Sequence, residues 1–214
     1  AREIGNRQSE SGALGNLGVA YADLGQYQEA LDFYEQALVI NREIGDRQGE
    51  GINLGNSGFA YTGLGQLEQA LEQFQQALAV AQDIGDRDSE GLWLSNMGAL
   101  LADPAQDQPE LAIVFYKQSV NVRESIRDDI QGLPQEQQQS FTDTIADSYR
   151  RLADLLLAQN RILEAQEVLD LLKLQELQDY ELQDIRGTAD TRLGLDFWEA
   201  EQAILDRFFT QLSI

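Results

Sequence analysis

The chain has 214 residues, of which 15 are basic and 37 acidic, so its formal net charge is -22. This charge repels phosphate backbones and anionic lipid surfaces, and we therefore expect neither nucleic acid nor a membrane as a partner. Cysteine and histidine are absent, which excludes disulfides, thiolate metal sites and the common nucleophile–base pairs of hydrolases. We predict a non-enzymatic protein without cofactor or metal. It also lacks a signal-like N-terminal segment, so we expect a cytoplasmic location.

A repeat of 40 residues dominates the first half of the chain. Residues 1–40 and 41–80 are identical at 21 of 40 aligned positions, and the pattern begins again after residue 80. The repeat places leucine, small and aromatic side chains at helical spacing, as in Leu54, Gly58, Tyr61, Ala70, Phe74 and Ala77. A fixed period of this length indicates a solenoid of stacked helical hairpins, and the sequence contains no strand candidates.

Glycines mark the expected helix ends. Gly25 ends the first helix of a hairpin, and Gly45 ends the second, because glycine readily takes the left-handed conformation. Asp46 follows Gly45 and can accept hydrogen bonds from the first amides of the next helix. We expect the pair Gly5–Asn6 to act in the same way. The first five expected helices are approximately 7–24, 27–44, 47–64, 67–84 and 87–103.

The repeat pattern divides the chain as follows. Residues 1–10 match 41–50 and are predicted to be the tail of a truncated preceding repeat. The predicted units after this tail are a first repeat at 11–46, a second at 47–86, a third with a two-residue turn insertion at 87–131, a degenerate fourth with long helices at 135–186, and a C-terminal capping helix at 196–214. The predicted turn of the fourth repeat lies near Gln159–Asn160. The capping helix is amphipathic and would cover the end of the stack.

The segments LGNLGVAYADLGQYQEAL and REIGDRQGE resemble tetratricopeptide repeat (TPR) arrays of the 40-residue kinesin-light-chain and Pins/LGN kind. The resemblance covers about residues 1–120. It implies an all-α fold, a right-handed TPR solenoid of stacked helical hairpins with a C-terminal capping helix. It also implies a scaffold that holds an extended protein or peptide in its concave groove. Because the chain is acidic, a basic or apolar ligand is favoured over an acidic one.

In such an array the first helix of each hairpin lines the groove. The predicted groove residues from the resemblance are Asn16, Asn56, Asn96, Val19, Phe59, Ile52, Thr62 and Ser95, and the same face of the second repeat also includes Gly55. A row of carboxamides can pair with the backbone of an extended peptide. The three asparagines have two open interpretations, because each could instead bond to a neighbouring helix or loop.

The C-terminal third, SYRRLADLLLAQNRILEAQEVLDLLKLQELQDY followed by GLDFWEAEQAILDRF, is similar to the segment that joins TPR arrays to CHAT domains in bacterial proteins. CHAT domains are caspase-like peptidase modules. This resemblance implies that the parent chain continues beyond Ile214 and that these residues are its regulatory or sensor arm, with the C-terminal part of that chain as a ligand. A third hypothesis is self-association, with a monomer or a weak homodimer formed through the truncated repeat end.

Overall fold

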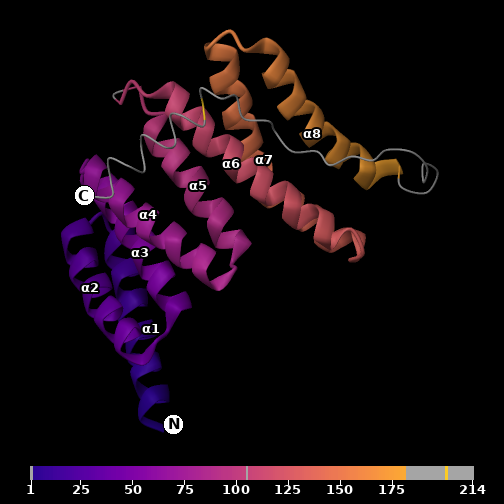
Figure 1. The fold of residues 1–214 in the computed structure, drawn as a ribbon. Coiled ribbons are helices and arrows are strands. Elements are labelled where there is room, and N and C mark those ends of the chain that lie inside the picture. Colours follow the sequence, from indigo (N-terminus) through magenta and orange to yellow (C-terminus); the bar gives the residue numbers. More distant parts are fainter. Residues whose placement is uncertain (1, 105, 182–200, 202–214) are drawn as a thin grey trace. The chain divides into compact units, whose positions relative to one another are not determined.

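The structure is a computed structural model that describes residues 2–104, 106–181 and 201. Within these residues it is all-helical and contains no strand, as predicted (Figure 1). The helices are α1 (Arg2–Asp23), α2 (Tyr27–Ile44), α3 (Arg47–Gly63), α4 (Leu67–Ile84), α5 (Arg87–Leu101), α6 (Pro109–Ile130), α7 (Gln135–Ala158) and α8 (Ile162–Glu181). The chain forms two compact units, residues 1–100 and 101–214.

Left-handed glycines end the first four helices of unit 1. Gly25, Gly45, Gly65 and Gly85 have φ between 70° and 74°. After α2, the amide of Asp46 donates to the Asn41 carbonyl at 2.8 Å, and the amide of Gly45 donates to the Arg42 carbonyl at 3.4 Å. These two bonds form a Schellman motif, which satisfies carbonyls that the helix end would leave unpaired. Asp46 Oδ1 then accepts a hydrogen bond from the amide of Gly49 at 2.9 Å. The predicted helix stops are confirmed at these positions.

The prediction was wrong at Gly5–Asn6, where α1 continues as one helix from Arg2 to Asp23. The stop at Gly45 is supported by tertiary contacts, because the Asn41 side chain bonds both to Asp46 and to Ser11 of α1. At Gly5 no carboxylate follows, and Asn6 is exposed. Without such support, the helical conformation that glycine also permits is retained.

Aromatic rings pack directly against helix backbones in unit 1. A Cβ atom added to Gly58 of α3 would lie 2.7 Å from the ring of Phe74 on α4, and one added to Gly18 of α1 would lie 2.4 Å from Tyr34 on α2. Both rings are buried. The hairpins α1–α2 and α3–α4 pack within themselves, and α2 packs against α3, so the core of unit 1 follows the 40-residue period.

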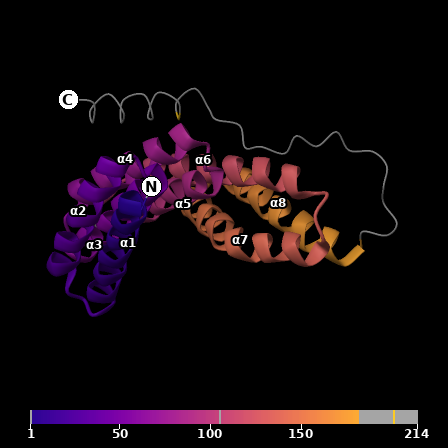
Figure 2. The ribbon, with the colours of Figure 1, turned by 90° about the horizontal axis from the view of Figure 1, so that it is seen from below.

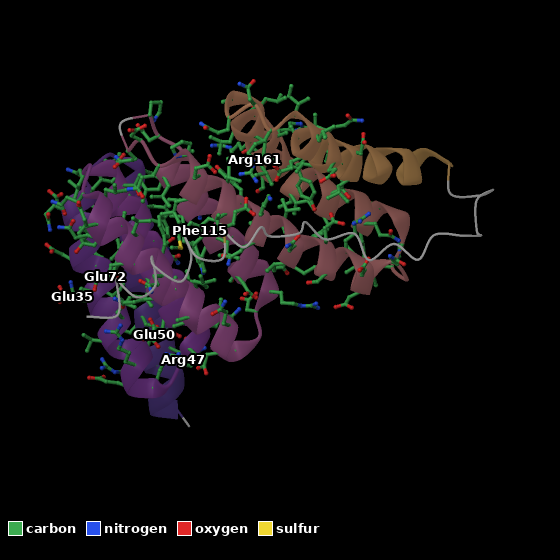
Figure 3. All side chains as sticks on the ribbon, turned by 45° about the horizontal axis from the view of Figure 1, so that its top comes forward. Glu35, Arg47, Glu50, Glu72, Phe115 and Arg161 are labelled. Atoms are coloured by element: carbon green, nitrogen blue, oxygen red, sulfur yellow. The ribbon has the colours of Figure 1, made fainter. Side chains whose placement is uncertain are left out.

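Ion pairs link one repeat to the next with the same period. Arg7 contacts Glu10 and Glu43, and forty residues later Arg47 contacts Glu50 and Asp83. Figure 3 shows Arg47 and Glu50 close together on α3. These arginines are therefore committed to carboxylates of their own chain.

Glu50 is the buried member of this ion-pair set. Burial opposes ionisation of its carboxyl, but the hydrogen bonds from Arg42 and Arg47 outweigh that effect and hold the pKa of Glu50 below its ordinary value. Its equivalent in the first repeat, Glu10, is exposed.

In unit 2, α7 packs against both α6 and α8 (Figure 2). Asn160 has φ 59° and ends α7, and the amide of Arg161 donates to the Leu156 carbonyl at 2.8 Å. The turn predicted near Gln159–Asn160 is therefore confirmed. The predicted capping helix at 196–214 lies outside the described residues, except for Glu201. Within the described part of the chain, no helix combines the length and apolar character needed to cross a membrane.

We predict that Gly58→Ala lowers the free energy of unfolding by about 1–3 kcal/mol, because its methyl group would overlap the buried Phe74 ring. Gly12→Ala is the control: it is also helical, but a Cβ there meets nothing within 4 Å, so it should be neutral or stabilising by up to about 1 kcal/mol. Urea unfolding followed by circular dichroism measures both. Equal effects of the two substitutions would contradict the close-packing explanation.

A second prediction concerns pH. Because the folded-state pKa of Glu50 is lowered, ionised Glu50 contributes stability above its ordinary pKa of 4.5, and this contribution is lost as the pH falls through the lowered value. Glu50→Gln should therefore cost about 1 kcal/mol at neutral pH, with the difference from wild type vanishing in acid. Glu10→Gln, at the exposed equivalent position, should cost less at neutral pH. A difference for Glu50→Gln that is independent of pH would exclude the ionic explanation.

Candidate functional site

The first helices of the hairpins in unit 1 carry long uncharged segments. Residues 11–22, 51–63 and 91–102 contain no charged side chain in a protein whose charged fraction is 24%. Five large hydrophobic side chains in these segments are exposed. One is Leu17 of α1, and the other four are Val19 of α1, Ile52 and Phe59 of α3, and Leu92 of α5. We call these four residues the apolar face.

The apolar face continues across neighbouring helices. Ile52 and Phe59 are seven residues apart, close to two turns, so they lie on one side of α3 with exposures of 49% and 47%. Val19 corresponds to Phe59, and Leu92 to Ile52, at the 40-residue period. Because α3 contacts α1 and meets α5 through Trp93, the equivalent positions form one strip.

Phe59 is held by two other aromatic rings. Its centroid lies 5.2 Å from Phe74 of α4 and 6.4 Å from Trp93 of α5, both in edge-to-face geometry. Phe74 and Trp93 are themselves stacked at 6.1 Å and are buried. Sequence analysis did not identify Trp93. The sequence did contain a signal for it: an aromatic residue stands at position 93, where the first two repeats have Ala13 and Asn53.

Gly55 does not belong to the exposed face, contrary to the prediction. It is buried, and a Cβ atom on it would lie 2.1 Å from the Trp93 ring. The glycine therefore lets the indole of the next repeat lie directly on the backbone of α3. This close approach sets the position of Trp93 beside Phe59.

The remaining predicted residues have varied environments. Thr62 is exposed, but its hydroxyl donates to the Gly58 carbonyl of its own helix at 2.8 Å. Ser95 is half-buried.

The three asparagines do not form a uniform row. Asn16 is exposed, whereas Asn56 and Asn96 are half-buried. Asn96 Nδ2 is buried and finds no hydrogen-bond partner within the described part of the chain. Asn56 lies four residues after Ile52, so it occupies the flank of α3 next to the apolar face. An unpaired buried amide costs free energy, and Asn96 is the carboxamide whose donor is left unsatisfied.

A family model described as tetratricopeptide repeat matches residues 9–83 and 50–125, which together exceed half of the 214 residues. A search of the curated proteins gives no match.

Two solved structures are similar to this chain. The crystal structure of BtubC (BKLC) from P. vanneervenii has a TM-score of 0.62 and 18% identity, and the alignment covers 88% of this chain and 71% of that one. The second contains nearly identical TPR-like repeats of a Podosopora anserina protein assigned as a kinesin light chain, with a TM-score of 0.34, 18% identity and coverage of 80% and 97%. At 18% identity, the first similarity shows a shared fold alone. The predicted TPR array is confirmed, and the chain belongs to the tetratricopeptide repeat family.

Proposed function

We propose that this chain is a non-enzymatic scaffold that binds an extended protein or peptide segment through its apolar face. TPR proteins in general bind protein partners. The observation that carries the proposal is the half-exposed Phe59 ring, which is held in place by Phe74 and Trp93. A ring fixed before binding loses little conformational entropy on contact and is a favourable anchor for a partner side chain.

The charge pattern favours an apolar or basic ligand over an acidic one. The apolar face carries no charge, while acidic residues such as Glu35 on α2 and Glu72 on α4 are exposed on the second helices (Figure 3). Arg7 and Arg47 of unit 1 are paired with carboxylates. An acidic peptide would therefore be repelled by the field of the whole chain.

Asn56 and Asn96 are the carboxamides placed to assist such a ligand. Both are half-buried beside the apolar face, and the Nδ2 group of Asn96 has an unused donor. Asn56 can pair with the backbone of an extended ligand, whereas the buried Nδ2 group of Asn96 is reached only if its side chain turns outward.

The role as a regulatory arm of a CHAT peptidase stays a prediction from the sequence. The family model ends at residue 125, so it does not reach the C-terminal third that carries this resemblance. In that version of the proposal, the ligand would be a segment of the parent chain. The bacterial source and the cytoplasmic location also stay predictions.

Self-association is a second candidate, favoured by one observation. Leu17 of α1 is 45% exposed, whereas its equivalents Ser57 and Met97 are buried. In α3 the side that carries Ser57 is covered, because α2 of the preceding hairpin packs against α3. The same side of α1 is open, so a second copy could cover it.

We predict that Phe59→Ala raises the dissociation constant for a bound peptide at least tenfold, about 1.4 kcal/mol or more. Peptides would be selected from a random phage-displayed library against the wild-type chain. Binding would then be followed by Trp93 fluorescence with Trp198 replaced by phenylalanine.

Val39→Ala is the matched control, because Val39 is also half exposed but lies on α2. It should leave affinity unchanged. Selected peptides that bind Phe59→Ala as tightly as wild type would refute binding at the apolar face, even if the chain still binds peptides elsewhere.

For self-association, we predict that light scattering of the wild-type chain shows a mass that rises with concentration. Leu17→Asp should remain monomeric over the same range, because a buried carboxylate disfavours the contact. Leu157→Asp, at a comparably exposed position on α7, should behave as wild type. A wild-type chain that stays monomeric throughout would remove this candidate.

A further inference from the structure

A buried cluster of charged side chains lies in unit 2. Lys117 of α6 is only 2% exposed, and its Nζ lies 2.8 Å from Glu164 Oε2 and 3.1 Å from Glu201 Oε2. Arg161, at the turn before α8 (Figure 3), also contacts both carboxylates. We call Lys117 and Arg161 the cationic pair.

The carboxylate of Glu201 bridges the two cations. Its Oε2 accepts from Lys117, and its Oε1 accepts a hydrogen bond from Arg161 Nη2 at 2.7 Å. Glu201 is itself 2% exposed. Each oxygen thus has a separate charge-assisted donor, and such hydrogen bonds are roughly twice as strong as neutral ones.

The charges of the cluster explain why a second carboxylate is needed. Glu164 binds Arg161 through both of its oxygens, at 2.6 Å each, and also accepts from Lys117. Burial opposes its ionisation, but these hydrogen bonds outweigh that effect and lower the pKa of Glu164. One ionised carboxylate would leave the buried Lys117 and the mostly buried Arg161 with a net charge of +1. An uncompensated buried charge is strongly unfavourable, and Glu201 compensates it.

No other carboxylate of the described helices serves as the second anion that neutralises the cationic pair. Glu110 lies 3.3 Å from Arg161, but its side chain is more than half exposed, so water screens the contact. Glu201 is 84 positions from Lys117 and 40 from Arg161 along the chain. The cations thus belong to the helical hairpins, and the second anion comes from a distant segment of sequence.

We propose that Lys117 and Arg161 form a carboxylate-binding site for a glutamate-bearing peptide segment, which Glu201 occupies in the same chain. The site prefers an acidic ligand, unlike the apolar face, and it acts independently of that face. A glutamate-bearing segment offered by another molecule competes with Glu201 for the cationic pair. Removing the Glu201 carboxylate opens the site.

The test uses the full chain and a fluorescent peptide with the sequence of residues 194–214. Glu201→Gln keeps the size of the side chain but removes its charge, so this variant should bind the peptide at least tenfold more tightly than wild type. The same peptide with glutamine at the position of Glu201 should bind at least tenfold more weakly to the variant. Circular dichroism confirms that the chains are folded.

Three further variants define the site. Adding Lys117→Met to Glu201→Gln should abolish the gain in binding, because it removes one of the two donors. Glu167→Gln, an exposed position on α8, should behave as wild type. Phe59→Ala should not change binding of this peptide. The experiment therefore tests the carboxylate-binding site separately from the proposed binding at the apolar face. Equal binding of the glutamate and glutamine peptides, or no binding to the Glu201→Gln chain, would overturn the proposal.

Discussion

The arrangement of unit 1 depends on the close approach of an aromatic ring to a glycine on the neighbouring helix. Phe74 lies on Gly58, and Tyr34 lies on Gly18 forty residues earlier. These contacts fix which side of each first helix is buried. Because an α-helix turns about 100° per residue, the opposite side is then left open to solvent. The exposure of Ile52 and Phe59 therefore follows from the packing of the repeat and not from a local feature of α3.

The two candidate sites use different parts of the same acidic chain. In unit 1, Arg7 and Arg47 pair with carboxylates, and the central turns of α1, α3 and α5 contain no charged residue. In unit 2, Lys117 is buried and Arg161 is mostly buried beside it, so water screens their charges less than at the surface. Apolar contact is thus the chemistry that unit 1 offers a ligand, and charge compensation is the chemistry that unit 2 offers. A single partner with one kind of side chain cannot satisfy both.

The features that were predictable from sequence are those set by residues close together in the chain. Gly45 and Asp46 form a helix stop within six residues, and the 40-residue period locates the hairpins. Ile52 and Phe59 were expected in the groove only from the family resemblance; both are exposed, and their role in binding stays a prediction. Trp93 over Gly55, and Glu201 on Lys117, join residues 38 and 84 positions apart, and no local pattern encodes such contacts. The error at Gly5 has the same origin, because tertiary contacts support the equivalent stop at Gly45 and a glycine alone does not impose it.

Because Glu201 belongs to the same chain as Lys117 and Arg161, a ligand from another molecule must compete with it for the carboxylate-binding site. A ligand within the same chain competes at an effective concentration, which is set by the length and stiffness of the connection. An acidic ligand from another molecule must therefore bind more tightly than Glu201, or be present above this effective concentration. It must also approach a chain with a net charge of -22. Free acidic peptides are therefore poor competitors while Glu201 is in place. The site becomes available to them only when the Glu201 carboxylate no longer occupies the cationic pair, so its occupancy depends on Glu201 more than on the abundance of acidic partners.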